Sequence, residues 1–225
     1  NFNLKLITIY YLMRISIVGV TGLVGTKLIK LIEKRNFSVN DFIPVASEDS
    51  EGRIIKLNKH EYITTIIDNI INIDLDLIFF CSTNQVSEEW IPKILKAQPN
   101  VKIIDNSSFY RLDKDVPLVV PEINSNLITS ETSLIANPNC STAQLVMVLY
   151  PLDQKYKIKR VVVSTYQSVS GSGITGIKQL IDESKGENIE KKVFQPSIYL
   201  NCIPFCDTLD PETDYTKEEL KLENE

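Results

Sequence analysis

The chain has 225 residues, of which 43% are hydrophobic and 24% are charged, and its formal net charge is -5 at pH 7. These values are typical of a globular protein long enough for a sizeable core, and the acidic balance argues against a dedicated nucleic-acid-binding protein. No run of residues is apolar for long enough to span a membrane.

The segment before Met13 differs from the rest of the chain. Residues 1–12 are apolar and aromatic, and Lys5 is their single charged residue. They lack the small-residue cleavage site of a signal peptide. We expect a non-native or disordered extension and a true start at Met13, with a membrane-surface anchor as the alternative.

A glycine-rich turn follows the first expected strand, residues 14–18. Glycines recur at positions 19, 22 and 25, and residues 26–35 have the apolar spacing of a helix. Strand, glycine turn and helix in this order are typical of a dinucleotide-binding unit. The first glycine would allow the tight turn, the second would admit a pyrophosphate to the helix N-terminus, and the third would let the helix pack closely. A plain strand-to-helix turn is the alternative.

An acidic loop follows the second expected strand, residues 41–47. Its residues are Glu48, Asp49 and Ser50. In a dinucleotide fold the end of this strand lies beside the adenine ribose. A carboxylate there suits the 2′-hydroxyl of NAD and repels the 2′-phosphate of NADP, although a solvated loop would have the same composition.

Two further strands are expected at residues 76–80 and 101–105, with a helix at 87–97 between them. We expect Ser87 to be the N-cap of this helix and Cys81 to be a packing residue. Short strand signals at 53–57 and 62–67 surround His60, the one histidine, which we interpret as a surface residue. Arg111 follows the last of these strands, where a guanidinium could hold a phosphate or carboxylate.

Cys140 lies at a strand-to-helix turn. Residues 133–136 form a short apolar run, residues 137–139 break it, and a mostly buried helix is expected from Ser141 onward. Unpaired N–H groups and the positive end of a helix dipole favour a thiolate, which is the nucleophilic form of cysteine. A small buried cysteine in a packed turn is the alternative.

None of the four cysteines, at positions 81, 140, 202 and 206, forms a CxxC pair. We therefore expect no metal site and no disulfide framework, and we expect a cytoplasmic protein.

The pattern changes after Tyr150. Residues 160–167 predict a long strand, 168–173 a small-residue loop and 174–184 a helix, which together suggest a second strand–glycine–helix unit. An ordinary loop is the alternative. We expect a dinucleotide-binding domain at 13–136 and an incomplete catalytic and dimerisation domain at 137–225.

Six motifs together resemble the bacterial aspartate-semialdehyde dehydrogenases. They are the glycine turn at 19–25, DNSS at 105–108, VPLVVPE at 116–122, ANPNCST at 136–142, VSTYQSVSG at 163–171 and YTKEE at 215–219. The likeness runs from Met13 to the end of the chain. It implies an α/β fold, with an N-terminal Rossmann-type dinucleotide-binding domain followed by part of an α+β catalytic and dimerisation domain.

The resemblance also implies a reaction. The family reduces 4-phospho-L-aspartate to aspartate 4-semialdehyde with release of phosphate, usually with NADPH, in the biosynthesis of lysine, methionine, threonine and diaminopimelate. It implies that Cys140 forms an acyl thioester, that Gln167 and Glu218 bind substrate, and that Arg111 and Lys221 hold its phosphate. With the acidic loop included, the candidate cofactor-binding residues are Gly19, Thr21, Gly22, Leu23, Val24, Gly25, Asp49, Ser50, Ser170, Gly171, Ser172, Gly173 and Ile174. The family is commonly a homodimer or homotetramer, and we expect no nucleic-acid or membrane partner.

Two departures from the family are visible. Its general acid–base histidine and its arginine for the substrate carboxylate lie in a C-terminal part that this chain lacks, and His60 does not match that histidine. We therefore expect an incomplete, catalytically impaired chain. Many relatives have a serine–arginine pair for the 2′-phosphate of NADP where this chain has acidic residues, so NAD is an alternative cofactor. The competing functions are N-acetyl-γ-glutamyl-phosphate reductase and a non-catalytic nucleotide-binding relic.

Overall fold

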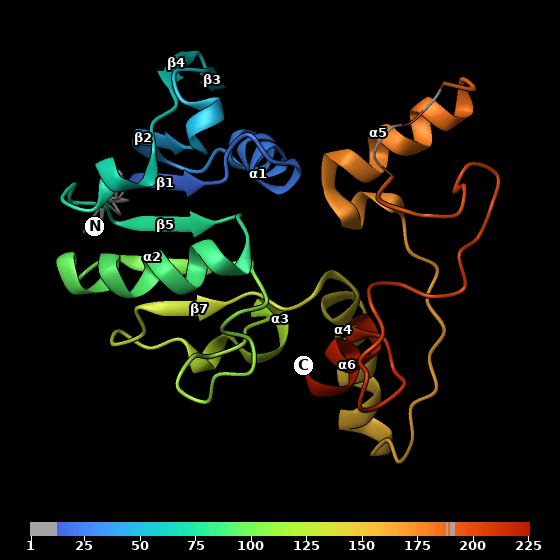
Figure 1. The fold of residues 1–225 in the computed structure, drawn as a ribbon. Coiled ribbons are helices and arrows are strands. Elements are labelled where there is room, and N and C mark those ends of the chain that lie inside the picture. The colour runs from blue at the N-terminus through green and yellow to red at the C-terminus, as the bar shows by residue number, and fades with distance from the viewer. Residues whose placement is uncertain (1–12, 188, 190–191) are drawn as a thin grey trace, which may run out of the picture. The chain divides into compact units, whose positions relative to one another are not determined.

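The computed structural model describes residues 13–187, 189 and 192–225 (Figure 1). The expected extension at 1–12 lies outside the described residues. The chain divides into two compact units. The first comprises the residues up to Phe109 together with Glu131–Ile135, and the second comprises Tyr110–Ser130 and Ala136–Glu225.

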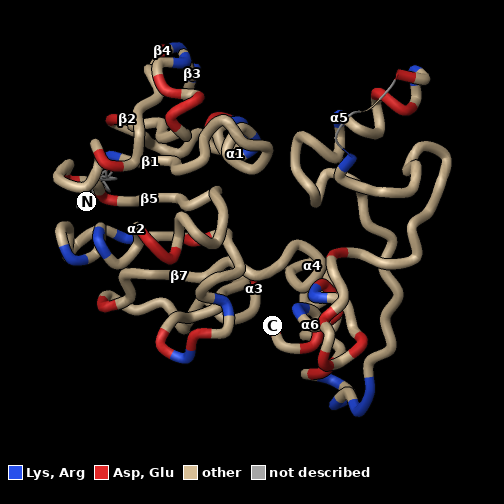
Figure 2. Tube along the Cα trace, in the orientation of Figure 1, with Lys and Arg blue, Asp and Glu red and all other residues tan. Residues whose placement is uncertain are grey.

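A five-stranded sheet with the order β2-β1-β5-β6-β7 organises the first unit (Figure 1). Its strands are β1 (Met13–Val18), β2 (Val39–Val45), β5 (Leu77–Phe80), β6 (Lys102–Asp105) and β7 (Leu134–Ala136). β1 pairs in parallel with both β2 and β5, and β5 pairs in parallel with β6. β5 and β7 carry no charged residue (Figure 2). Helices connect the parallel strands, so the Rossmann-like α/β fold predicted from the sequence is confirmed.

Two helices pack on this sheet, α1 (Leu23–Lys34) and α2 (Asn84–Ala97). Ile29 and Ile32 of α1 join Ile15 and Ile17 of β1 in the apolar core. α1 begins three residues before the predicted start, because Gly22 already serves as its N-cap.

The prediction that Ser87 caps the second helix is wrong. Thr83 is the N-cap of α2, so Ser87 lies inside the helix and is fully buried. Its hydroxyl donates to Oδ1 of Asp105 at 2.9 Å, and that carboxylate also accepts the backbone N–H and the hydroxyl of Ser107. A buried carboxylate must accept hydrogen bonds, and the bond to Asp105 holds the Ser87 side chain in the interior.

A small hairpin of β3 (Ile54–Leu57) and β4 (His60–Ile63) completes the first unit. Two short 3-10 helices flank it, η1 (Glu48–Ser50) and η2 (Ile67–Ile70). His60 begins β4 and is exposed, so its interpretation as a surface residue is confirmed.

The first and last glycines of the predicted turn have steric reasons to be glycine. Gly19 has φ +83°, and a Cβ there would lie 2.5 Å from the carbonyl oxygen of Cys81. A Cβ on Gly25 would collide with the carbonyl oxygen of Gly19. The turn is therefore tight and the helix lies close to the strand, as the spacing predicts.

Helices and irregular segments make up the second unit. Its elements are α3 (Pro121–Asn124), η3 (Ser125–Leu127), α4 (Cys140–Tyr156), η4 (Val169–Ser172), α5 (Gly173–Ser184) and α6 (Lys217–Asn224). In the described part of the chain, no helix combines the length and the hydropathy needed to cross a bilayer.

Two predictions for this unit are wrong. Residues 160–167 do not form a strand, because no backbone pairs with them within the described residues, and Val162 is 79% exposed. Without that strand the described residues form no second strand–glycine–helix unit, although the helix predicted at 174–184 is present as α5. α4 is not mostly buried either, since Thr142 is its one buried residue. Several of its large apolar side chains, Met147 and Val148 among them, are exposed.

Candidate active site

Cys140 is the first residue of α4 and is exposed. Asn139 is the N-cap, and its side-chain oxygen accepts the backbone N–H of Ser141 at 2.8 Å. An asparagine N-cap stabilises the start of a helix in this way. The structure thus confirms the strand-to-helix turn, and the alternative of a buried, packed Cys140 is wrong.

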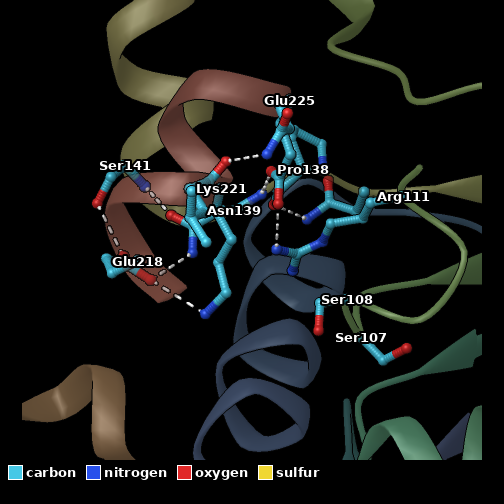
Figure 3. A network of polar contacts seen from close by, with 12 residues as sticks. Ser107, Ser108, Arg111, Pro138, Asn139, Ser141, Glu218, Lys221 and Glu225 are labelled. Carbon is cyan, nitrogen blue, oxygen red and sulfur yellow. Dashed lines mark hydrogen bonds and ion pairs between the residues drawn. The ribbon is translucent and has the colours of Figure 1, made fainter. Parts of the chain in front are cut away.

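The buried carboxylate of Glu218 in α6 accepts hydrogen bonds from several polar side chains (Figure 3). α6 begins with a capping box formed by Thr216 and Glu219, which places Glu218 in the first turn. The Glu218 carboxylate accepts hydrogen bonds from Gln167 Nε2 at 2.8 Å, Asn139 Nδ2 at 3.1 Å and Lys221 Nζ at 3.2 Å. Gln167, Glu218 and Lys221 therefore lie together, beside the residue that precedes Cys140.

Lys221 supplies a fixed positive charge in this cluster. Its ammonium group bonds Asp207 at 2.9 Å as well as Glu218. Burial lowers the pKa of Lys221, but the hydrogen bonds and charges of Asp207 and Glu218 together raise it above its ordinary value. Lys221 is therefore protonated at neutral pH.

Two other cysteines are kept in the thiol form. Burial, with a smaller contribution from Asp105, raises the pKa of Cys81 to about 12, in keeping with a packing role. Burial also raises the pKa of Cys206, and the nearby carboxylates of Glu218 and Asp207 raise it further. Neither thiol therefore competes as a thiolate near neutral pH.

Arg111 reaches the same turn through Glu225. Arg111 Nη1 lies 3.0 Å from Glu225 Oε1, and the two side chains are 9% and 2% exposed. The second carboxylate oxygen, Oε2, accepts the backbone N–H of Asn139 at 2.6 Å (Figure 3). Asn139 is thus held by Glu218 at its side chain and by Glu225 at its backbone.

The first unit offers a dinucleotide site at the N-terminus of α1. The N-cap is Gly22, which has no side chain, and within the described residues no side-chain oxygen caps the first turn. Leu23 and Val24 belong to that turn. Backbone N–H groups of this kind bind a pyrophosphate, so these residues fit a dinucleotide cofactor.

The remaining candidate cofactor residues lie in two places. Asp49 is exposed in η1, whereas Ser50 is buried and its carbonyl oxygen accepts the Thr64 hydroxyl at 2.6 Å. Residues 170–174 belong to η4 and the start of α5 in the second unit, where Gly173 has φ +75°.

Sequence reasoning missed Asn139, Asp207 and Glu225 as members of the cluster. An asparagine directly before a helix is a recognisable N-cap signal and could have identified Asn139. The Arg111–Glu225 pair joins residues 114 apart, and no local pattern points to it.

Comparison with known proteins gives matches along nearly the whole chain. The family model "Semialdehyde dehydrogenase, NAD binding domain" matches residues 14–131, and "Semialdehyde dehydrogenase, dimerisation domain" matches residues 149–225.

Individual relatives agree with these matches. The aspartate-semialdehyde dehydrogenase of Aquifex aeolicus is 42% identical over 217 residues, covering 93% of this chain and 63% of that protein. The Helicobacter pylori J99 protein of the same name is 42% identical, covering 94% and 65%. The crystal structure of aspartate semialdehyde dehydrogenase II complexed with ASA from Vibrio cholerae superimposes with a TM-score of 0.86 at 35% identity, covering 94% and 64%. The chain thus spans 63% to 65% of the length of these relatives.

Proposed function

The chain belongs to the semialdehyde dehydrogenase family, and from this premise we propose that it catalyses the reductive dephosphorylation of 4-phospho-L-aspartate to aspartate 4-semialdehyde. The observation that carries the proposal is the position of Cys140, exposed at the N-terminus of α4 beside the cluster around Glu218. A nucleophile at a helix N-terminus, beside a cluster that contains Lys221 and Arg111, suits attack on an acyl phosphate.

The proposed reaction has a covalent intermediate on Cys140. The thiolate attacks the acyl carbon, a C–S bond forms, and the C–O bond to the phosphate breaks with release of inorganic phosphate. A bound nicotinamide dinucleotide would supply the hydride that reduces the thioester. When the resulting hemithioacetal collapses, its hydroxyl gives up a proton, the C–S bond breaks, the aldehyde forms and the Cys140 thiolate is regenerated.

Two cations would stabilise the departing phosphate. Lys221 stays protonated, and Arg111 carries a permanent charge. Gln167 and Glu218 would contact the aspartyl part of the substrate, because both lie in the hydrogen-bonded cluster beside Asn139.

The chain carries the family's NAD-binding domain, and we propose NADP as its usual cofactor, with NAD as the alternative. The exposed carboxylate of Asp49 favours NAD if it faces the ribose, because it would repel a 2′-phosphate. The ratio of kcat/KM values for the two cofactors decides: a ratio strongly in favour of NADP excludes a role for the acidic loop in cofactor choice.

We also propose a homodimer or homotetramer in the cytoplasm. The match to a dimerisation domain and the exposed apolar side chains of α4, Met147 and Val148 among them, support self-association. The reducing compartment follows from the chemistry, because the nucleophile must remain a thiol, and the cysteines are free.

The proposal is tested with the intact gene product in the phosphorylating direction, with aspartate 4-semialdehyde, phosphate and NADP. We expect turnover that C140S lowers by at least about a thousandfold, whereas C202S, at an exposed cysteine, leaves it unchanged. Equal or faster turnover with N-acetyl-glutamate 5-semialdehyde would favour the related reductase. Nucleotide binding without any turnover would favour the non-catalytic relic.

A further inference from the structure

Glu225 occupies a position that neither the sequence motifs nor the proposed reaction explains. Its side chain is 2% exposed, whereas Glu223, two residues earlier in the last turn of α6, is exposed. One carboxylate oxygen of Glu225 lies 3.0 Å from Arg111 Nη1, and the other accepts the Asn139 N–H at 2.6 Å. A single buried group therefore joins a candidate phosphate ligand to the turn that carries Cys140.

The chemistry of the two partners explains why this group is a carboxylate. Arg111 and the Asn139 backbone N–H are both donors, so the bridging side chain must accept on both of its terminal atoms. An ionised glutamate does this, but a glutamine would turn its NH₂ group toward one of the donors. The Arg111 guanidinium is also nearly buried, so loss of the carboxylate would remove a negative charge that lies 3.0 Å from it.

The same helix holds Asn139 from a second side. Glu218 Oε2 accepts the Asn139 side-chain N–H at 3.1 Å, while the Asn139 side-chain oxygen caps α4 through Ser141. With Glu225 on its backbone N–H, Asn139 has little freedom to rotate. The start of α4, and with it Cys140, is fixed by contacts from both ends of α6.

We propose that Glu225 is a positioning residue, which orients the Arg111 guanidinium to receive the phosphate and holds the Asn139 turn in register with it. This inference rests on the proposed function, since it concerns the phosphate of that reaction. Glu225 acts through Arg111 and Asn139, and contact with the substrate is not required of it.

A competing role for Glu225, in which its carboxylate occupies the phosphate site, predicts the opposite effect on phosphate binding. If the carboxylate merely filled a pocket that phosphate could take, Glu225 would compete with phosphate, and its removal would improve phosphate binding. If Glu225 positions Arg111, its removal weakens phosphate binding, because the guanidinium loses the contact that orients it toward the Asn139 turn.

The test measures the KM for inorganic phosphate in the phosphorylating direction for E225Q, E225D and the matched control E223Q. We expect E225Q to raise the KM for phosphate about tenfold or more, E225D to raise it less because it keeps the charge, and E223Q to leave it unchanged. In an R111Q background, E225Q should add little to the effect on this KM, since Glu225 acts on phosphate through Arg111. The KM for NADP should not change.

Several outcomes overturn the proposal. It is wrong if E225Q leaves the KM for phosphate unchanged or lowers it. It is also wrong if E225D has no activity while E225Q has the wild-type KM for phosphate. If E225Q does not fold by circular dichroism, E225D alone decides by the same criterion. If the wild-type protein shows no turnover, the proposed function fails. The proposal is then judged by the phosphate concentration that protects Cys140 from iodoacetamide, which must rise in E225D or E225Q and not in E223Q.

Discussion

Apolar side chains fill the first unit, whereas the second unit encloses mainly polar ones. In the first unit, large residues such as Phe42 and Phe80 are almost completely buried. In the second unit, the buried residues within the described part of the chain are polar apart from Val119, Ala136, Pro138 and Gly176. The polar ones are Asn139, Thr142, Gln179, Asp182, Thr216 and Glu218. The first unit is therefore stabilised by apolar burial, and the second is ordered by specific hydrogen bonds.

Because of this difference, stability and the geometry around Cys140 depend on different units. The apolar core of the first unit gives a rigid frame for the turn at Gly19 and the start of α1. In the second unit, carboxylates and amides set the positions of Cys140 and its neighbours, while apolar side chains of α4 remain exposed. Polar networks fix geometry at little net gain in stability.

The largest effect is expected from a core substitution in the first unit. Phe80→Ala removes a fully buried ring from β5 and should lower the free energy of unfolding by about 3–5 kcal/mol. Trp90, the single tryptophan, lies in α2 of that unit, so its fluorescence follows the unfolding. Val162→Ala in the second unit, at a side chain that is 79% exposed, is the control. It should change the free energy of unfolding by less than about 0.5 kcal/mol. Similar losses for both variants would contradict the comparison.

A smaller loss of unfolding free energy is expected from removal of a buried polar group in the first unit. Ser87→Ala removes the hydroxyl that donates to Asp105 and should cost about 1–2 kcal/mol in urea unfolding. Asp105 keeps its bonds from Ser107, which limits the loss. Glu89→Gln on the same helix breaks an exposed pair with Lys93 and should cost less than about 0.5 kcal/mol. Equal costs would mean that the buried hydrogen bond adds nothing.

A local effect is expected in the second unit on acidification. Glu183 accepts hydrogen bonds from Gln179, the Tyr199 and Ile198 backbone N–H groups and the Ser197 hydroxyl. These bonds, that from Gln179 most of all, lower the pKa of Glu183 from 4.5 to about 2. Because the pKa is lowered, the stabilisation that ionised Glu183 gives to this segment is complete above pH 4.5 and is lost as the pH falls toward 2.

Hydrogen exchange measures this effect. Protection of the Ile198 and Tyr199 amides should fall over that acidic range, while amides of β5 stay protected. Glu183→Gln should lower this protection already at neutral pH, and Glu187→Gln, at an exposed residue, should not. Protection of these amides that is independent of pH in the wild-type protein would show that Glu183 does not hold the segment.

The sequence predicts those features that depend on local patterns. Apolar runs identified β1, β5 and β6, and the glycine spacing identified the turn before α1. The Asn-Pro-Asn break located the helix start at Cys140. Each of these requires only residues close together in the chain.

Features that depend on distant partners could not be predicted. Serine is a common N-cap residue, but the Ser87 hydroxyl donates a hydrogen bond to the buried Asp105. Residues 160–167 have the composition of a strand, but pairing needs a neighbouring backbone, which the described residues do not supply. Arg111 could be selected by motif, yet its partner Glu225 lies far along the chain.

The central claim is that Cys140 is the nucleophile at the head of α4. The most direct test mixes the intact gene product with 4-phospho-L-aspartate in the absence of a nicotinamide cofactor, digests it at acidic pH and measures peptide masses. We predict an aspartyl group on the peptide that contains Cys140, with release of an equal amount of phosphate. Phosphate release without an adduct, or an adduct on Cys202 or Cys206 instead, would contradict the account.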